Sequence, residues 1–163
     1  MTAGTPLHRK FIFCFAALSL GGVASPRCEI RRGDASLGIL SSGVAAQVVT
    51  FPRVSLGIHY QKQRGVAVYG LRQRYHLNPD APRTNFFVGL EENRVTFDID
   101  GVKGRGWTGG AFLGLDYFVA RRWSLEMDAG PAFIALEDGD SAVTNEGLDF
   151  VANVGLNWHW GGR

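Results

Sequence analysis

Apolar and polar residues alternate with a period of two through most of the second half of the chain. From Trp107 to Val119, one face carries mainly apolar residues, and the other is mixed, with Thr108, two glycines, Phe112, Asp116 and Phe118. Residues 123–135 and 148–160 repeat this alternation. A period of two is typical of β-strands, whereas an amphipathic helix repeats about every 3.6 residues. The pattern therefore predicts three long strands in this half.

The first half shows the same alternation in shorter segments. Residues 54–61 and 66–77 each have one apolar and one polar face. In residues 85–99 the apolar positions change from even to odd numbers. A β-bulge near Glu91–Arg94 would cause this change, and so would a tight turn that divides the segment into two strands. The sequence leaves both alternatives open.

The number and length of the strands indicate a membrane barrel. Residues 35–51 form either one strand or two short strands around Ser41–Gly43, and seven strands are otherwise readable. Bacterial barrels have an even number of strands, so we expect eight, with the first in Arg27–Leu40. The last three strands run roughly 13 to 14 residues, against about 9–11 for crossing a membrane and about 5–6 in soluble proteins. The predicted fold is an all-β, antiparallel, up-and-down transmembrane β-barrel.

Two kinds of connection alternate along the chain and predict which end of the barrel faces which side. Three are short or marked by proline: 51–53, 78–84 and 120–122. Three are polar and rich in glycine: 62–65, 101–106 and 137–147. Outer-membrane barrels have short periplasmic turns and longer external loops. Aromatic residues from separate hairpins lie beside the short, proline-marked turns, and we expect them to form one belt at the membrane surface. The alternative is that they are ordinary core residues. They are Phe51, Tyr75, Phe86, Tyr117, Trp123, Trp158 and Trp160.

The beginning of the chain has the layout of a secretory signal peptide. Arg9 and Lys10 precede an apolar run from Phe11 to Leu20, and small residues follow to Ser25. We expect cleavage after Ala24, which makes residues 1–24 a signal peptide and residues 25–163 the barrel. The alternative, an N-terminal membrane anchor, is disfavoured because the apolar run is short for a span.

Cleavage would change both the charge and the cysteine content of the protein. Without Arg9 and Lys10, 15 basic residues balance 15 acidic residues, so a nucleic-acid partner is not expected. Cys28 would be the one remaining cysteine, which excludes an internal disulfide and has no assigned role. After residue 24 there is no apolar run of 18 residues, which disfavours a helical membrane protein.

Several motifs resemble those of small outer-membrane β-barrels. They are Gly106-Trp107-Thr108-Gly109-Gly110-Ala111-Phe112-Leu113-Gly114-Leu115-Asp116-Tyr117-Phe118, then Trp123-Ser124-Leu125-Glu126-Met127-Asp128-Ala129-Gly130, the turn Arg74-Tyr75-His76-Leu77-Asn78-Pro79, and Leu156-x-Trp158-x-Trp160. Over about residues 50–160 the chain is similar to the adhesion/resistance barrels and the porin-like outer-membrane β-barrel domain. The resemblance implies outer-membrane lipid and the barrel-assembly machinery as partners. Members tend to end on an aromatic residue, whereas Gly161-Gly162-Arg163 follow Trp160 here. These families share an architecture and no single activity, so no function is carried over.

The polar face of the strands predicts the content of the barrel interior. It carries Arg72, Arg74, His76, Asp116, Glu126, Asp128, Asp149, Asn153, Asn157 and His159. An eight-stranded barrel is just wide enough to be filled by its side chains, and buried charges need partners. We therefore expect a charge network of Arg72, Arg74, Asp116, Glu126, Asp128 and Asp149 that plugs the lumen, with the arginines facing Glu126 and Asp128.

This interior favours a structural or surface-interaction protein, whose surface partner the sequence does not identify. The alternatives are a narrow pore and a secreted or periplasmic lipocalin-like barrel with an apolar interior. No His-x-Ser-Asn-type motif is present, so no catalytic residue is assigned and no enzyme is expected. Asp98-x-Asp100 and Asp138-Gly139-Asp140 are better explained as turns than as calcium ligands, so neither metal nor cofactor is expected. Leu113→Arg should be strongly destabilising and Gly114→Ser milder.

Overall fold

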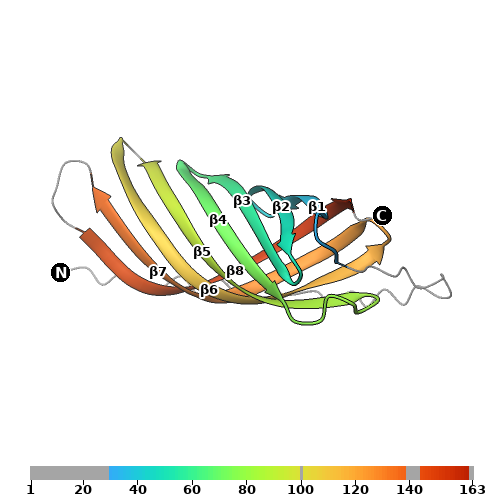
Figure 1. Ribbon diagram of the computed structural model, residues 1–163. Helices are drawn as coiled ribbons and strands as arrows, with labels where there is room; N and C mark the ends of the chain where they lie inside the picture. The colour runs from blue at the N-terminus through green and yellow to red at the C-terminus, as the bar shows by residue number, and fades with distance from the viewer. Residues whose placement is uncertain (1–29, 100, 139–143, 162–163) are drawn as a thin grey trace, which may run out of the picture.

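The computed structural model describes residues 30–99, 101–138 and 144–161, which form one closed antiparallel barrel (Figure 1). Each strand pairs with its neighbours in sequence, and β8 returns to pair with β1. The predicted all-β, up-and-down barrel of eight strands is therefore confirmed. The strands are β1 (Ala35–Leu40), β2 (Gly43–Phe51), β3 (Val54–Gln63), β4 (Val66–His76), β5 (Thr84–Ile99), β6 (Val102–Ala120), β7 (Trp123–Asp138) and β8 (Thr144–Trp160).

The first strand lies inside the range expected for it, and residues 35–51 form two strands that meet at Ser41 and Ser42. No helix in the described part of the chain is long and apolar enough to cross a membrane. The predicted signal peptide and Cys28 lie outside the described residues, as do Asp100, Gly139 and Asp140.

The register of the strands fixes the width of the barrel. Leu40 leads through the successive pairings to Asn145 on β8, but pairs directly with Gly155, ten residues further along that strand. With a rise of about 3.3 Å per residue and a strand spacing of about 4.8 Å, this stagger tilts the strands by about 40°. Eight strands at this tilt enclose a narrow interior that side chains can fill.

The wall of the barrel is much taller on one side than on the other. The strands β1 to β4 have 6, 9, 10 and 11 residues, whereas β5 to β8 have 16, 19, 16 and 17. The longer strands project beyond the others at the end opposite the C-terminus (Figure 1). We call the part beyond the paired positions Arg94, Trp107, Ala135 and Glu146 the projecting sheet. One edge of β8 pairs with β7, and the other pairs with β1. Between Thr144 and Asn153 this second edge has no partner strand, because β1 ends opposite Gly155.

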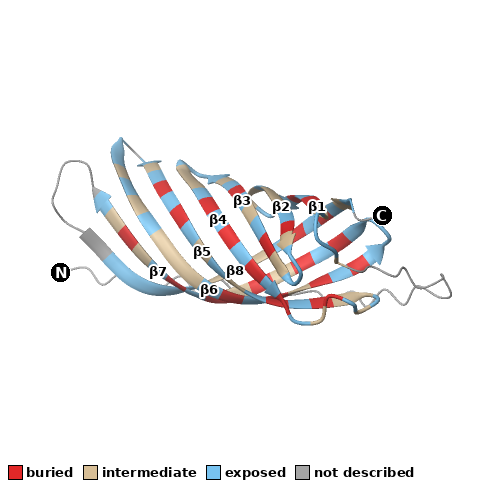
Figure 2. Ribbon diagram, viewed as in Figure 1, coloured by how far each residue is buried: buried red, intermediate tan, exposed pale blue. Residues whose placement is uncertain are grey.

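Below the projecting sheet, that is, toward the end of the barrel at Trp160, the outward positions are mainly apolar. The inward positions carry most of the polar side chains, together with buried rings such as Phe87 and Phe112. Buried and exposed positions alternate along the strands in stripes (Figure 2). On β4, Leu71 is 63% exposed, whereas Arg72 and Arg74 are 5% and 4% exposed. Glu126 on β7 is 2% exposed. This distribution is the opposite of that in a lipocalin-like barrel, whose interior would be apolar.

The expected bulge or turn within residues 85–99 is wrong. The strand β5 is continuous, and its register with β4 and β6 does not shift. Its odd-numbered residues face inward throughout, so Phe87 and Val95 are both buried, while Glu92 and Arg94 are exposed. The surroundings of the strand change along its length, and this moves the apolar residues from one face to the other.

The long glycine-rich loops are also shorter than expected. Residues 101–106 belong mostly to β6, which begins at Val102, and β7 and β8 extend into 137–147. Gly101 has a φ of 85° and occupies the turn itself. A Cβ at Gly104 would collide with the ring of Phe97 on the neighbouring strand. That glycine marks close packing within the sheet and not a loop.

Candidate functional site

A charged cluster crosses the barrel interior at mid-height. Inward positions of β4 supply Arg72 and Arg74, and inward positions of β7 supply Glu126 and Asp128. Arg72 Nη1 lies 3.2 Å from Glu126 Oε1, and Arg72 Nη2 lies 3.0 Å from Asp128 Oδ1. Arg72 Nε lies 3.1 Å from Oε2 of Glu91 on β5, and Arg74 Nη2 pairs with Glu126 Oε1. We call these five residues the central cluster.

Aromatic rings and amides fix the orientation of the central cluster. The guanidinium of Arg72 lies 4.2 Å from the ring centroid of Phe112, and that of Arg74 lies 4.6 Å from that of Phe87. Cations over an aromatic face are held by the negative charge of the ring face. The carboxylates accept further hydrogen bonds from amides on β8: Asn157 Nδ2 donates to Glu126 Oε2 at 2.6 Å, and Asn153 Nδ2 donates to Asp128 Oδ1 at 2.9 Å.

Two of the predicted members stand apart from this cluster. Asp116 is buried, and its Oδ1 accepts hydrogen bonds from Ser124 Oγ at 3.4 Å and Asn157 Nδ2 at 3.5 Å. It forms no ion pair with a described residue. Asp149 is exposed, and its Oδ1 accepts a hydrogen bond from the backbone N–H of Phe150 at 2.7 Å. Placing Asp149 in the network was therefore wrong, because β1 ends before this height and the lumen there is open.

Other members of the site were missed from the sequence. Glu91, Phe87 and Phe112 lie on the inward phase of β5 and β6, and each touches an arginine of the central cluster. The odd-numbered phase of residues 85–99 would have identified Glu91 and Phe87, had the segment been taken as one continuous strand. Phe112 was placed on the inward face but, being apolar, gave no sign of contact with a charge.

Serine–histidine pairs fill the interior at the end of the barrel near Trp160. Ser55 Oγ lies 3.0 Å from His76 Nε2, and Asn85 Nδ2 lies 2.7 Å from His76 Nδ1. Ser124 Oγ lies 2.8 Å from His159 Nε2. Ser55, His76 and Ser124 have no exposed surface, so these pairs lie entirely within the packed interior.

The described residues contain no group of three or more His, Cys, Asp or Glu side chains placed to hold a metal ion. This applies to the central cluster as well, where the carboxylates face guanidinium groups.

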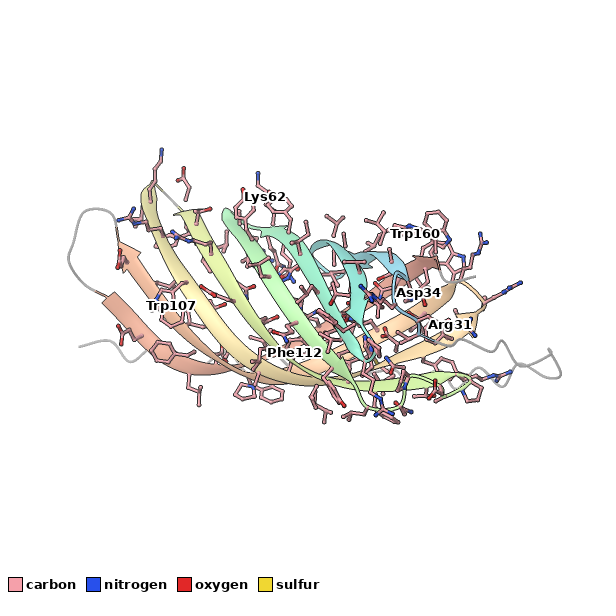
Figure 3. The ribbon with its side chains drawn as sticks, viewed as in Figure 1. Arg31, Asp34, Lys62, Trp107, Phe112 and Trp160 are labelled. Atoms are coloured by element: carbon pink, nitrogen blue, oxygen red, sulfur yellow. The ribbon has the colours of Figure 1, made fainter. Side chains whose placement is uncertain are left out.

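Outward aromatic residues lie in two bands. The lower aromatic ring contains the predicted residues, all exposed: Phe51, Tyr75, Phe86, Tyr117, Trp123, Trp158 and Trp160. The upper aromatic ring was not predicted and contains Tyr60, Tyr69, Trp107 and Phe133, also exposed. The labelled Trp107 and Trp160 lie toward opposite ends of the barrel (Figure 3). Tyr60 and Tyr69 have ring centroids 5.0 Å apart, and those of Trp107 and Phe133 are 5.6 Å apart.

Comparison with solved structures places this architecture among the small outer-membrane barrels. The chain is similar to the N-terminal β-barrel domain of Pseudomonas aeruginosa OprF, with a TM-score of 0.56 and 13% sequence identity, over 79% of this chain and 98% of that one. It also matches Neisserial surface protein A with a TM-score of 0.43 and 15% identity, over 77% and 92% of the two chains. No protein-family model and no curated protein matches the sequence. The likeness to OprF shows the fold: the chain has the architecture of a small outer-membrane β-barrel.

Proposed function

We propose that this protein is an outer-membrane barrel with a structural or surface-interaction role, and that the central cluster plugs its lumen. The membrane location is supported by the outward apolar band between the two aromatic rings. On β6, Trp107 and Tyr117 are ten residues apart, which is about 25 Å along the axis for strands tilted by about 40°. The apolar band of outer-membrane barrels is also about 25 Å tall.

The plug is supported by one observation above the others, the reach of Arg72 across the interior. Its guanidinium lies within 3.2 Å of carboxylates on both β5 and β7. Arg74 pairs with the same Glu126 one inward position lower, so two layers of side chains cross the bore. Side chains paired in this way leave little space for water, and a steady ion current through the wild-type barrel is not expected.

The direction of the barrel follows from its unequal ends. The projecting sheet carries polar residues on its outer face, including Lys103 and Arg105, which suit contact with water and not with lipid. We place it outside the cell, and the turns near the lower aromatic ring in the periplasm. Export by a signal peptide cleaved after Ala24, and insertion by the barrel-assembly machinery, belong to the same proposal.

We propose no catalytic activity for the barrel. Among the described residues, the serine–histidine pairs are the arrangement that resembles a nucleophile with its base. Ser55 and Ser124 have no exposed surface, so a substrate cannot reach either hydroxyl. Their hydrogen bonds satisfy polar groups below the central cluster.

Membrane fractionation followed by electrophoresis with and without heating tests this proposal. We expect the protein in the outer-membrane fraction, with a mobility that changes on heating as the barrel unfolds. Release as a soluble periplasmic protein would contradict the membrane location. Planar-bilayer recording tests the plug separately: no steady conductance is expected, and a steady conductance would make a narrow pore the better function.

A further inference from the structure

Two cations lie on the outer wall at the upper edge of the upper aromatic ring. Arg94 on β5 is the cross-strand partner of both Tyr69 and Trp107. Lys62 on β3 pairs with Ala67 on β4, which in turn pairs with Thr96, two residues beyond Arg94. Ala67, which lies between Lys62 and Thr96 on this outward face, presents only a methyl group. Lys62 points away from the wall at the end opposite Trp160 (Figure 3).

These two cations differ from the others on the same wall. Higher up, Lys103 Nζ lies 3.6 Å from Asp98 Oδ2, and Arg105 Nε lies 3.7 Å from Glu137 Oε2. In contrast, neither Lys62 nor Arg94 has an ion-pair partner among the residues that the structure describes. Both are exposed, so an anion arriving from outside can reach them.

An outward groove of about 550 Å³ begins at Arg94 and descends into the apolar band. Its lining is mainly apolar and crosses from β5 to β1. One row of paired positions contributes Leu71, Ile58, Ala46 and Leu37, and the next contributes Tyr69 and Tyr60. Ala46 leaves space within the row because its side chain is a single methyl group. The groove therefore runs from a cationic rim at the membrane surface toward the middle of the outer leaflet.

We propose that this groove binds a phosphorylated lipid of the outer leaflet, with its phosphate on Arg94 and Lys62 and one acyl chain along the groove. The inference rests on the membrane location proposed above. A guanidinium and an ammonium pair well with phosphate oxygens, and the upper aromatic ring lies at the height of the headgroups. Glu92 lines the same groove below Arg94. It repels a phosphate, which places the phosphate on the side of Arg94 that faces Lys62.

Tryptophan fluorescence gives a direct readout, because Trp107 is beside Arg94. The other three tryptophans, Trp123, Trp158 and Trp160, belong to the lower aromatic ring. The probe is phosphatidic acid with brominated acyl chains, which quench a nearby indole, added to the full chain folded in detergent micelles. We expect saturable quenching that Trp107→Phe removes. Brominated phosphatidylcholine, in which the phosphate is esterified to cationic choline, should need a higher concentration for the same quenching.

The double variant Lys62→Gln/Arg94→Gln tests the cationic rim. The concentration for half-maximal quenching should rise about tenfold or more, the loss expected when charge-assisted hydrogen bonds are removed. The matched control Lys103→Gln/Arg105→Gln removes two outward cations from β6 and should leave the concentration for half-maximal quenching unchanged. Heat-modifiable mobility verifies that each variant is folded.

Three results would overturn the site on a correctly folded barrel. They are equal quenching by the two lipids, equal effects of the two double variants, and displacement of the lipid by inorganic phosphate at the same concentration, which would show a phosphate site and no lipid site. If the wild-type chain were absent from the outer membrane, the proposed function itself would fail, and the lipid site with it.

Discussion

The pairing of Arg74 with Glu126 is the contact of the plug that a single substitution would break completely, whereas Arg72 has three carboxylate partners. Within the described residues, Glu126 is the one carboxylate that forms an ion pair with Arg74. Glu126→Leu would leave that guanidinium 4% exposed, with the ring of Phe87 on one side and no ion-pair partner among the described residues. Breaking a buried pair by removing one partner costs about 3–5 kcal/mol, because the remaining charge stays desolvated. We expect a loss of this size in the free energy of unfolding.

Removing both charges should cost less than removing the carboxylate alone. In Arg74→Met/Glu126→Leu no guanidinium is stranded at this level, and Arg72 keeps Glu91 and Asp128 as partners. Replacing a buried pair by apolar residues of similar volume is often neutral or stabilising. We therefore expect the double variant to recover about 1 kcal/mol or more relative to Glu126→Leu. Such a recovery lies within the range of coupling energies measured between residues in contact.

Urea unfolding in lipid vesicles, followed by tryptophan fluorescence and by heat-modifiable mobility, measures the four free energies of this cycle. Glu91→Leu is the matched control. Its side chain is more exposed than that of Glu126, and Arg72 retains two other carboxylates without it, so the loss should be clearly smaller. If the double variant lost the sum of the two single losses, Arg74 and Glu126 would be uncoupled and a water-filled lumen would replace the plug.

Three further predictions use single substitutions. Leu113→Arg should lower the free energy of unfolding in vesicles by about 2–4 kcal/mol, whereas Leu148→Arg, which faces outward at the upper aromatic ring, should lower it by about 0–1 kcal/mol. Equal losses would show that the proposed position of the membrane along the barrel is wrong. For Gly114→Ser, a Cβ would lie 2.5 Å from the ring of Phe87, so we now expect a loss of about 1–3 kcal/mol by the same assay and not the mild effect that its polar-facing position suggests. An unchanged unfolding midpoint would refute this packing. Phe150→Pro should still give a folded, heat-modifiable barrel, because the backbone N–H of Phe150 faces the unpaired edge of β8. Val151→Pro, in contrast, removes a backbone hydrogen bond between β7 and β8 and should impair folding.

Strand number and the inside–outside assignment of β6 to β8 were predictable from the sequence. Each strand below the upper aromatic ring has one face toward lipid and one toward a narrow polar interior. Apolar and polar residues therefore alternate within each strand, and this alternation can be recognised without knowing the neighbouring strands. Arg72 and Arg74 could be placed in the interior for the same reason. Period two alone identified them, without knowledge of any partner strand.

The segment 85–99 shows where local alternation stops being informative. Its apolar residues change phase because β5 leaves the apolar band near Glu92 and continues into the projecting sheet, where the outer face meets water. A change of surroundings and a change of register give the same sequence pattern. Only the pairing of β5 with β4 and β6 distinguishes them, and the location of Glu91 in the interior follows from that pairing.

The contacts of the central cluster were decided by the tertiary structure alone. Period two shows that Arg72 faces inward, but not which strand lies across from it. That is set by the closure of β8 on β1 and the ten-residue stagger of the register, which together bring β4 opposite β7 at the height of Glu126. The same stagger, with the early end of β1, leaves Asp149 at an open height although its phase is the inward one. The sequence of a strand determines which face each residue occupies, while the height and partner of that residue depend on how all eight strands close.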